Sequence, residues 1–312
     1  MPAPLLLVTR LPPDEEAGWR RALARAMPGE TIATAADHPD RTTVEIAVVA
    51  NPPAGSLRDL PALHWVHSLW AGVERLLQDA TMPPVPLVRL VDPMLARAMA
   101  ETVAASVLHL HRGLHVYAAQ QRRRAWIPHP FQPATGRPIT ILGLGEMGRA
   151  AAELLVSLGF PVRGWSRSGA PVPGVSIFSG EEGLTDALDG AQVLVNLLPL
   201  TPETRGILRA STFARLAPGA YLINFGRGAH LVEVDLLEAL AAGQVGHAVL
   251  DVFEQEPLPA DHPAWSHPGV TVLPHVAAPT SRASAAAVVA AAVAAFRRTG
   301  LCPAGIDRQR GY

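Results

Sequence analysis

The chain contains 312 residues, and all 26 of its Lys+Arg residues are arginine. Without lysine there is no Schiff-base lysine, no pyridoxal-phosphate anchor and no P-loop, whose lysine reaches the terminal phosphates. The single cysteine, Cys302, excludes an intramolecular disulfide and any multi-cysteine zinc or iron–sulfur site, and it favours a reducing environment. A net charge of −1 leaves no basic excess for binding nucleic acid.

Length and hydrophobicity predict two domains outside the membrane. At about 150 residues per domain the chain makes two domains, and 49% hydrophobic residues supply material for two cores. The longest apolar run without a basic residue, 283–296, has 14 residues, fewer than the ~20 that a bilayer-spanning helix needs. The N-terminus lacks the basic leader and long apolar stretch of a signal peptide. We therefore expect a cytoplasmic protein without membrane partners.

The first part of the chain alternates short apolar runs with turns and helical patterns, which is typical of an α/β domain with a parallel sheet. Four runs are expected to be strands: Leu5–Val8, Val44–Val49, Trp65–Ser68 and Leu87–Leu90. One long helix is expected from about Met94 to Trp126, because Asp92-Pro93 signals its start and Pro128 its end.

A second and stronger series of strands follows that helix. Its members are Ile139–Leu142, Val162–Trp165, Val193–Leu197, Tyr221–Asn224, Ala248–Leu250 and Val270–Leu273. The fold class that we predict is α/β, with two Rossmann-like, doubly wound parallel-sheet domains. The dinucleotide-binding domain, residues 99–276, is inserted into a substrate domain made of residues 1–98 and of the C-terminal helix and tail, 277–312.

A glycine-rich turn joins the first strand of this series to a helical pattern. Gly143 permits the tight turn, Gly145 lets the backbone approach a pyrophosphate, and Gly148 lets helix and strand pack closely. The diphosphate then lies at the helix N-terminus, where free N–H groups and the helix dipole favour an anion. The G-x-G-x-x-G pattern is weak by itself, but with a strand before it and a helix after it the pattern predicts dinucleotide binding.

The end of the next strand indicates which dinucleotide is bound. NAD enzymes place an acidic residue here to bind the ribose hydroxyls, whereas this stretch is Trp165, Ser166, Arg167 and Ser168, without a carboxylate. A guanidinium flanked by hydroxyls suits a 2′-phosphate. We therefore predict that NADP(H) is preferred over NAD(H); the alternative is a surface turn that happens to be basic.

Three polar residues lie just past the ends of successive predicted strands, where ligands bind in open α/β sheets. They are Arg227, Glu256 and His275. A histidine beside a carboxylate stays protonated near neutral pH and acts as a general acid. An arginine offers a planar fork for a carboxylate and polarises a neighbouring ketone. The set predicts reduction of a 2-keto acid, with hydride from C4 of the nicotinamide and a proton from His275.

From about Trp65 onward the chain resembles the D-isomer-specific 2-hydroxyacid dehydrogenases, and among them the glyoxylate/hydroxypyruvate reductase A type. The motifs that carry the resemblance are GLGEMG, WSRS, NLLPLTPET, INFGRGAHLVEVDLLEAL, LDVFEQEPLP, HPGVTVLPHVAA and the terminal IDRQRGY. The resemblance implies an NADPH-dependent reductase of glyoxylate, hydroxypyruvate or a similar small keto acid. It assigns substrate binding to Arg227, orientation of the histidine to Glu256 and acid/base catalysis to His275.

The resemblance also extends the set of expected ligand contacts. The cofactor contacts are Gly143, Leu144, Gly145, Glu146, Met147, Gly148, Trp165, Ser166, Arg167, Ser168, Leu198, Pro199, Leu200, Thr204, Asn224, Phe225, Gly226, Asp251 and His275. The substrate contacts are Trp70, Ala71, Gly72, Trp126, Arg227 and His275. The amides of the loop at Trp70 suit a carboxylate, and the bulky indole favours small acids unless it is a core tryptophan.

The resemblance further implies a homodimer formed through residues 99–130, with Trp126 reaching the partner's active site. It implies no metal, and the histidine pair His111 and His115 makes at most half a metal site. Two alternatives stay open: a broad 2-ketoacid reductase with another physiological substrate, and a non-catalytic NADP(H)-sensing protein on the same fold.

Overall fold

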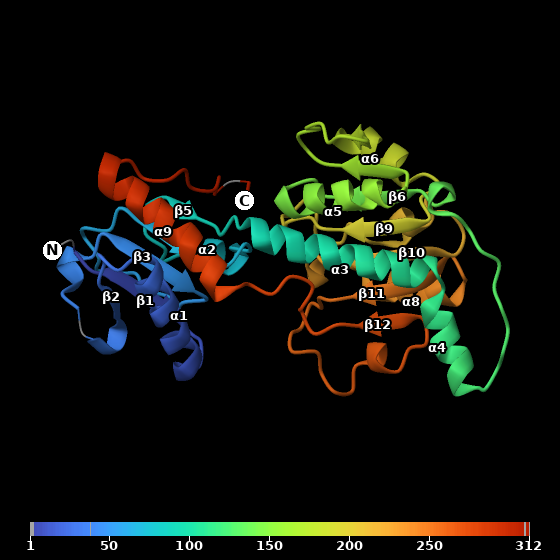
Figure 1. Cartoon of the computed structure of the whole chain (residues 1–312), viewed down its shortest axis with the longest axis horizontal. Helices are drawn as coiled ribbons and strands as arrows, with labels where there is room; N and C mark the ends of the chain where they lie inside the picture. Colours follow the sequence, from blue (N-terminus) through green and yellow to red (C-terminus); the bar gives the residue numbers. More distant parts are fainter. Residues whose placement is uncertain (1–2, 38, 309, 312) are drawn as a thin grey trace. The chain divides into compact units, whose positions relative to one another are not determined.

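The structure is a computed structural model that describes residues 3–37, 39–308 and 310–311. The chain divides into two compact units, Met1–Met94 with Thr280–Tyr312, and Leu95–Pro279 (Figure 1). The first unit is thus made from both ends of the chain, and the second is inserted between them. Both sheets are parallel, so the expected fold class is confirmed.

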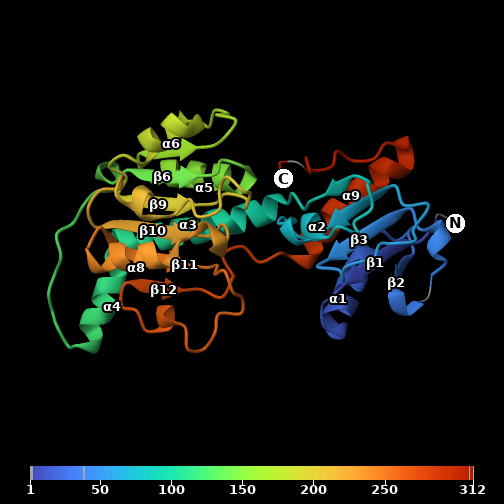
Figure 2. The same cartoon turned by 180° about the vertical axis from the view of Figure 1, so that it is seen from behind.

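The first unit contains a five-stranded sheet. Its strands are β1 (Leu5–Thr9), β2 (Ile32–Thr34), β3 (Ile46–Ala50), β4 (Trp65–Ser68) and β5 (Leu87–Val88), in the order β2-β1-β3-β4-β5. The strands are almost wholly apolar because both faces of the sheet are covered. Helices α1 (Pro13–Ala26) and α9 (Arg282–Thr299) lie side by side on one face (Figures 1 and 2). Helix α2 (Glu74–Gln78) contributes Leu76 to the core cluster of Leu6, Val49 and Val66.

The C-terminal helix of the first unit is tied to this sheet by one arginine. Arg297 donates to the carboxylate of Glu30 at 3.0 and 3.1 Å, to the carbonyl of Ala3 at 3.2 Å and to Glu45. Its charge is therefore compensated by two carboxylates where water is partly excluded, which is the condition for a planar guanidinium to bind firmly.

The second unit contains a seven-stranded sheet in the order β12-β11-β10-β9-β6-β7-β8. The strands are β6 (Ile139–Leu142), β7 (Val162–Trp165), β8 (Val175–Phe178), β9 (Val193–Asn196), β10 (Ala220–Asn224), β11 (Val245–Leu250) and β12 (Val270–Val272). Counted from β6, this is the 3-2-1-4-5-6 order of dinucleotide-binding folds with one strand added. The strand order reverses between β6 and β9, so the crevice for a ligand is expected at the carboxyl ends of these two strands.

Helices cover both faces of this sheet. On one face α3 (Pro93–His111) and α5 (Glu146–Ser157) pack with Ile141, Val195 and Ile223 (Figure 1). On the other face the helices pack with Leu142, Leu194 and Leu222 (Figure 2). Those helices are α6 (Gly180–Leu188), α7 (Ala210–Phe213) and α8 (Glu233–Ala241). Short 3-10 turns complete the described elements at Ala35–Asp37, Arg41–Thr43, Ala134–Gly136, Gly228–His230 and Pro263–Trp265.

The single helix expected from Met94 to Trp126 is wrong. Helix α3 ends at His111, and a separate helix α4 (Leu114–Arg122) follows. Gly113 between them has φ +64°, a left-handed conformation that ends a helix and that glycine adopts without strain. Trp126 therefore lies in the segment after α4, and its side chain is 98% exposed. Two further strands, β2 and β8, were not expected from the sequence.

None of the helices that the described part of the chain forms has the length and apolar character needed to cross a membrane.

Candidate active site

The glycine-rich turn lies at the carboxyl end of β6, at the reversal of strand order. The N–H of Gly143 donates to the carbonyl of Trp165 on β7 at 2.8 Å, and the N–H of Leu197 donates to the carbonyl of Leu142 at 2.8 Å. Helix α5 begins immediately after Gly145, and no side chain caps its first N–H groups. These N–H groups point into the region where an anion is best stabilised by the helix dipole.

The three glycines differ in what surrounds them. Gly143 has φ +96°, and a Cβ there would lie 2.9 Å from the backbone of Leu197. A Cβ on Gly148 would lie 1.8 Å from the carbonyl oxygen of Gly143. A Cβ on Gly145 would meet nothing within 4 Å, so this position borders open space. The first and third glycines are thus closely packed, and the second leaves space for a ligand to approach the backbone. A turn that binds a dinucleotide diphosphate has these properties.

The segment after β7 presents the polar groups expected for a 2′-phosphate. Ser166 accepts a hydrogen bond from the N–H of Gly169 at 3.3 Å, which forms a tight turn. Arg167 and Ser168 are exposed on this turn. The indole of Trp165 donates to the carbonyl of Gly180 at 2.8 Å, which holds the strand end against α6.

The loop after β9 is held by its own hydrogen bonds. The hydroxyl of Thr204 donates to the carbonyl of Pro199 at 2.8 Å and accepts from the N–H of Thr201 at 2.8 Å. Thr204 and Leu198 are buried, and Leu200 is partly exposed. The conformation of this loop is therefore stabilised by its own hydrogen bonds, and the loop lies next to the glycine turn.

Arg227 follows β10 and lies between Gly226 and Gly228, two positions where a side chain would collide with neighbouring atoms. A Cβ on Gly226 would lie 2.7 Å from the amide nitrogen of Asn196, and one on Gly228 would lie 1.9 Å from the backbone of Phe253. The guanidinium of Arg227 donates to the carbonyl of Gly226 at 2.7 Å. Asn224 and Phe225, which precede it, are buried.

His275 and Glu256 form a hydrogen-bonded pair. Nδ1 of His275 lies 2.8 Å from Oε2 of Glu256, and Oε1 of Glu256 accepts from the N–H of Phe253 at 3.0 Å. Because a carboxylate accepts, Nδ1 carries a proton, and Nε2 is left for another partner. His275 has φ +56°, a strained conformation for a residue with a side chain, which is characteristic of functional sites.

The surroundings of this pair favour the protonated form of His275. The hydrogen bond and charge of Glu256 raise the pKa of His275, against partial burial and the charge of Arg227. Burial opposes ionisation of Glu256, but the hydrogen bonds from His275 and the Phe253 N–H, with the charge of Arg227, hold its pKa below its usual value. An imidazolium beside a carboxylate therefore persists at higher pH than a free histidine would allow.

Asp251 accepts hydrogen bonds from the loop that carries His275. The sequence did not indicate this role of Asp251. Its two oxygens accept from the N–H groups of Val276 at 2.7 Å and Ala277 at 2.9 Å, and its carbonyl accepts from the N–H of His275 at 2.9 Å. Asp251 is 2% exposed, and burial raises the pKa of its carboxyl. The strained conformation of His275 is thus supported by three backbone N–H groups, of His275, Val276 and Ala277, that donate to Asp251.

The remaining expected substrate loop, Trp70 to Gly72, belongs to the first unit. The N–H of Trp70 donates to the hydroxyl of Ser68 at 3.0 Å, and its carbonyl accepts from the N–H of Leu90 at 3.1 Å. Its indole packs edge-on against Trp19 of α1, with ring centroids 5.8 Å apart. The loop, including Ala71, is therefore anchored at the carboxyl end of β4.

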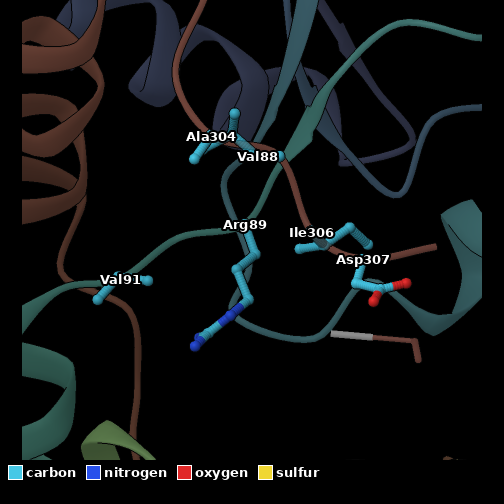
Figure 3. A pocket seen from close by; sticks show the side chains of 7 residues that line it. Val88, Arg89, Val91, Ala304, Ile306 and Asp307 are labelled. Atoms are coloured by element: carbon cyan, nitrogen blue, oxygen red, sulfur yellow. The ribbon is translucent and has the colours of Figure 1, made fainter. Parts of the chain in front are cut away.

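A pocket that the sequence did not predict lies in the first unit, between the residues that follow β5 and the C-terminal tail. There the N–H of Ile306 in the C-terminal tail donates to the carbonyl of Leu87 on the edge strand β5 at 2.8 Å. Figure 3 shows the side chains of Arg89 and Asp307 extending from the ribbon in different directions. The pocket is lined by Val88, Arg89, Val91, Ala304, Gly305, Ile306 and Asp307.

Comparisons with known proteins show which family the chain belongs to. The family model for the NAD-binding domain of D-isomer specific 2-hydroxyacid dehydrogenases matches residues 104–277. Glyoxylate/hydroxypyruvate reductase A of Serratia proteamaculans (strain 568) is 43% identical over 301 residues, which cover 94% of this chain and 96% of that protein.

Solved structures match the whole chain. The D-isomer specific 2-hydroxyacid dehydrogenase from Xanthobacter autotrophicus Py2, in complex with NADPH and MES, has a TM-score of 0.94 and 36% identity, covering 100% of both chains. The NADPH-dependent glyoxylate/hydroxypyruvate reductase from Sinorhizobium meliloti, in complex with NADP and sulfate, has a TM-score of 0.89 and 36% identity, covering 99% of this chain and 100% of that chain. This chain therefore belongs to the D-isomer specific 2-hydroxyacid dehydrogenase family.

Proposed function

We propose that the protein reduces a small 2-keto acid, such as glyoxylate or hydroxypyruvate, to the 2-hydroxy acid with NADPH. The observation that carries the proposal is the hydrogen bond of 2.8 Å between His275 and Glu256 in the electrostatic field of Arg227. The relatives from Serratia proteamaculans and Sinorhizobium meliloti, both named as glyoxylate/hydroxypyruvate reductases, support the same substrate class.

In this proposal each of the three residues has a defined chemical role. NADPH, when bound, supplies the hydride that the carbonyl carbon receives. The guanidinium of Arg227 binds the substrate carboxylate and polarises the ketone oxygen. His275 donates its Nε2 proton to that oxygen, while Glu256 holds Nδ1 and stabilises the imidazolium. In the reverse direction neutral His275 accepts the proton of the hydroxyl group.

The other expected ligand contacts keep their roles in this proposal. The glycine turn Gly143–Gly148 would bind the diphosphate, and Leu198, Pro199, Leu200 and Thr204 would cover the cofactor. Arg167 with Ser166 and Ser168 would bind the 2′-phosphate, and the relatives from Xanthobacter autotrophicus and Sinorhizobium meliloti, which hold NADPH and NADP, support this preference. Trp70 would restrict the site to small acids, with Ala71 and Gly72 binding the carboxylate.

The proposal includes a homodimer. The segment 114–131 exposes large apolar side chains, and water-exposed apolar patches mark interaction surfaces. They are Leu114, Tyr117, Trp126, Ile127 and Phe131, with Trp126 98% and Phe131 72% exposed. A second copy of this chain is the proposed partner, with Trp126 contributing to its active site. A cytoplasmic location fits the single cysteine.

The test is oxidation of NADPH in the presence of a panel of 2-keto acids. We expect turnover with glyoxylate and hydroxypyruvate and a loss of ~10²–10⁴-fold in kcat for His275→Ala, because the general acid is removed. Faster turnover with larger keto acids would favour a broad 2-ketoacid reductase. Protein that binds NADPH but oxidises it with no acid would refute the proposal and favour an NADPH sensor.

A further inference from the structure

A histidine outside the expected catalytic set lies between the ends of two strands of the nucleotide-binding sheet. His230 is fully buried, three residues after Arg227. Its Nδ1 lies 2.8 Å from the amide nitrogen of Asn196 on β9 and 3.1 Å from the backbone nitrogen of Arg227. Its Nε2 lies 3.2 Å from the carbonyl oxygen of Pro199. Both ring nitrogens are therefore engaged without water.

These partners determine where the ring proton lies. The backbone N–H of Arg227 can only donate, so Nδ1 of His230 accepts, whereas the carbonyl of Pro199 can only accept, so Nε2 carries the proton. The neighbouring amides agree with this assignment. Oδ1 of Asn196 accepts from the N–H of Leu198 at 3.3 Å, which leaves its NH₂ group for His230. A doubly protonated ring would place an N–H group against two donors.

Through these bonds the backbone of Arg227 is held on both sides. Its N–H donates to His230, and its carbonyl accepts from the amide of Asn224 at 3.1 Å. Asn224 in turn accepts from the amide of Asn196 at 2.8 Å, which joins the ends of β9 and β10. The side chain of Arg227 extends from this hydrogen-bonded backbone. The position of its guanidinium therefore depends on the backbone conformation that the network stabilises.

His230 also reaches the loop after β9. Pro199, which accepts from Nε2 of His230, accepts from the hydroxyl of Thr204 as well. One imidazole therefore connects the backbone of the arginine to the loop 198–204. Mutually supporting hydrogen bonds of buried groups specify one arrangement, because each unsatisfied partner would cost free energy.

We propose that His230 is a positioning residue for the reaction: Nδ1 fixes Arg227 for the keto acid, and Nε2–H fixes the loop 198–204 over the cofactor. This inference rests on the proposed function, since it assigns keto acid and cofactor to these two segments. A residue that filled space alone would not need both nitrogens, and its replacements would not act differently on the two ligands.

Two variants separate the two nitrogens. His230→Asn places an amide oxygen near Nδ1 and loses the group that reaches Pro199, whereas His230→Gln places an NH₂ group near Nε2 and loses the acceptor for Arg227. His230→Phe keeps a planar ring without either nitrogen. The measurements are kcat and KM for glyoxylate, and the Kd of NADPH from the change in its fluorescence.

We expect His230→Gln to lose about tenfold or more in kcat/KM for glyoxylate with a nearly unchanged Kd for NADPH, because a buried N–H is left without an acceptor. His230→Asn should show the opposite pattern, with weaker NADPH binding, and His230→Phe should show both losses. The positioning role would be overturned if all three variants lost activity and NADPH affinity equally, in proportion to the decrease in their Tm. It would also be overturned if the variants kept the kinetics and the NADPH binding of an active wild type. An inactive wild type would refute the proposed function instead.

Discussion

Replacing Glu256 with glutamine tests the proposed proton transfer most directly, because it keeps the shape of the side chain and removes its charge. The structure decides how the new amide lies. Oε1 of Glu256 accepts from the N–H of Phe253 at 3.0 Å, so the amide oxygen of glutamine belongs there. Its NH₂ group then faces Nδ1 of His275, where the carboxylate oxygen now lies at 2.8 Å.

An NH₂ group at that position changes the protonation of the histidine. Because the amide donates, Nδ1 of His275 must accept, and the single remaining ring proton lies on Nε2. Giving up that proton would leave an imidazolate, so the ring no longer acts as an acid. Turning the amide would set its NH₂ against the N–H of Phe253, at a cost of ~1–3 kcal/mol for an unsatisfied buried donor. We therefore expect kcat for keto acid reduction to fall by ~10²–10⁴-fold.

The pH profile gives an independent measure. The hydrogen bond and charge of Glu256 raise the pKa of His275. Because the proposed reduction uses the protonated form, we expect the wild-type rate to fall as pH rises through that pKa. In Glu256→Gln this fall should begin at lower pH, because the stabilising charge is absent. The assay is kcat and kcat/KM for glyoxylate across the neutral range with saturating NADPH.

A matched control is available two residues earlier. Glu254 is exposed and pairs with Arg205 at 3.3 Å, and surface pairs contribute little. Glu254→Gln should therefore leave rate and pH profile unchanged. A Glu256→Gln enzyme with a kcat within about threefold of the wild type and the same pH profile would refute the assignment of His275 and Glu256 as the acid pair.

Three further outcomes are expected. Arg227→Lys should lose about a hundredfold in kcat/KM for glyoxylate in steady-state assays, because lysine lacks the planar fork; retained affinity would place the carboxylate elsewhere. Arg167→Ala should raise the KM for NADPH by about tenfold or more and leave that for NADH nearly unchanged, and an equal effect on both would remove Arg167 from phosphate recognition. Burial lowers the pKa of His247 from 6.5 to about 4. Between these two pH values the unfolded chain binds a proton on this histidine that the folded chain does not bind, so the free energy of unfolding should decrease as pH drops from 6.5 toward 4. Urea unfolding at pH 7 and pH 5 should show a contribution of about 2 kcal/mol that His247→Phe removes, and an identical pH dependence in the variant would contradict it.

The parts of the fold that could be predicted are those with local signals. The apolar runs of β6, β9 and β10 and the glycine turn between β6 and α5 are recognisable because both faces of a parallel sheet are buried and the turn needs particular glycines. The break at Gly113 was missed, since a glycine within a helical pattern is often tolerated. The three-residue strand β2 and the partly polar β8 carry too little periodicity to be recognised.

The sequence by itself determined which residue types are available for the proposed reaction. Without lysine, the cationic tasks of the proposed reaction fall to Arg167 and Arg227, and the histidine and carboxylate for proton transfer follow strand ends that share one edge of a sheet. These properties depend on residue type and on short spacings, so they are visible in the chain.

Only the tertiary structure decided how these side chains are held. Glu256 meets His275 across 19 positions of sequence, Asp251 supports the histidine loop across 25 and 26, and His230 meets Asn196 across 34. Such partners are brought together by the order of the strands and the packing of the loops between them. A buried hydrogen bond between distant segments leaves no periodic or local pattern in the sequence, so the network around Arg227 becomes visible only in the folded chain.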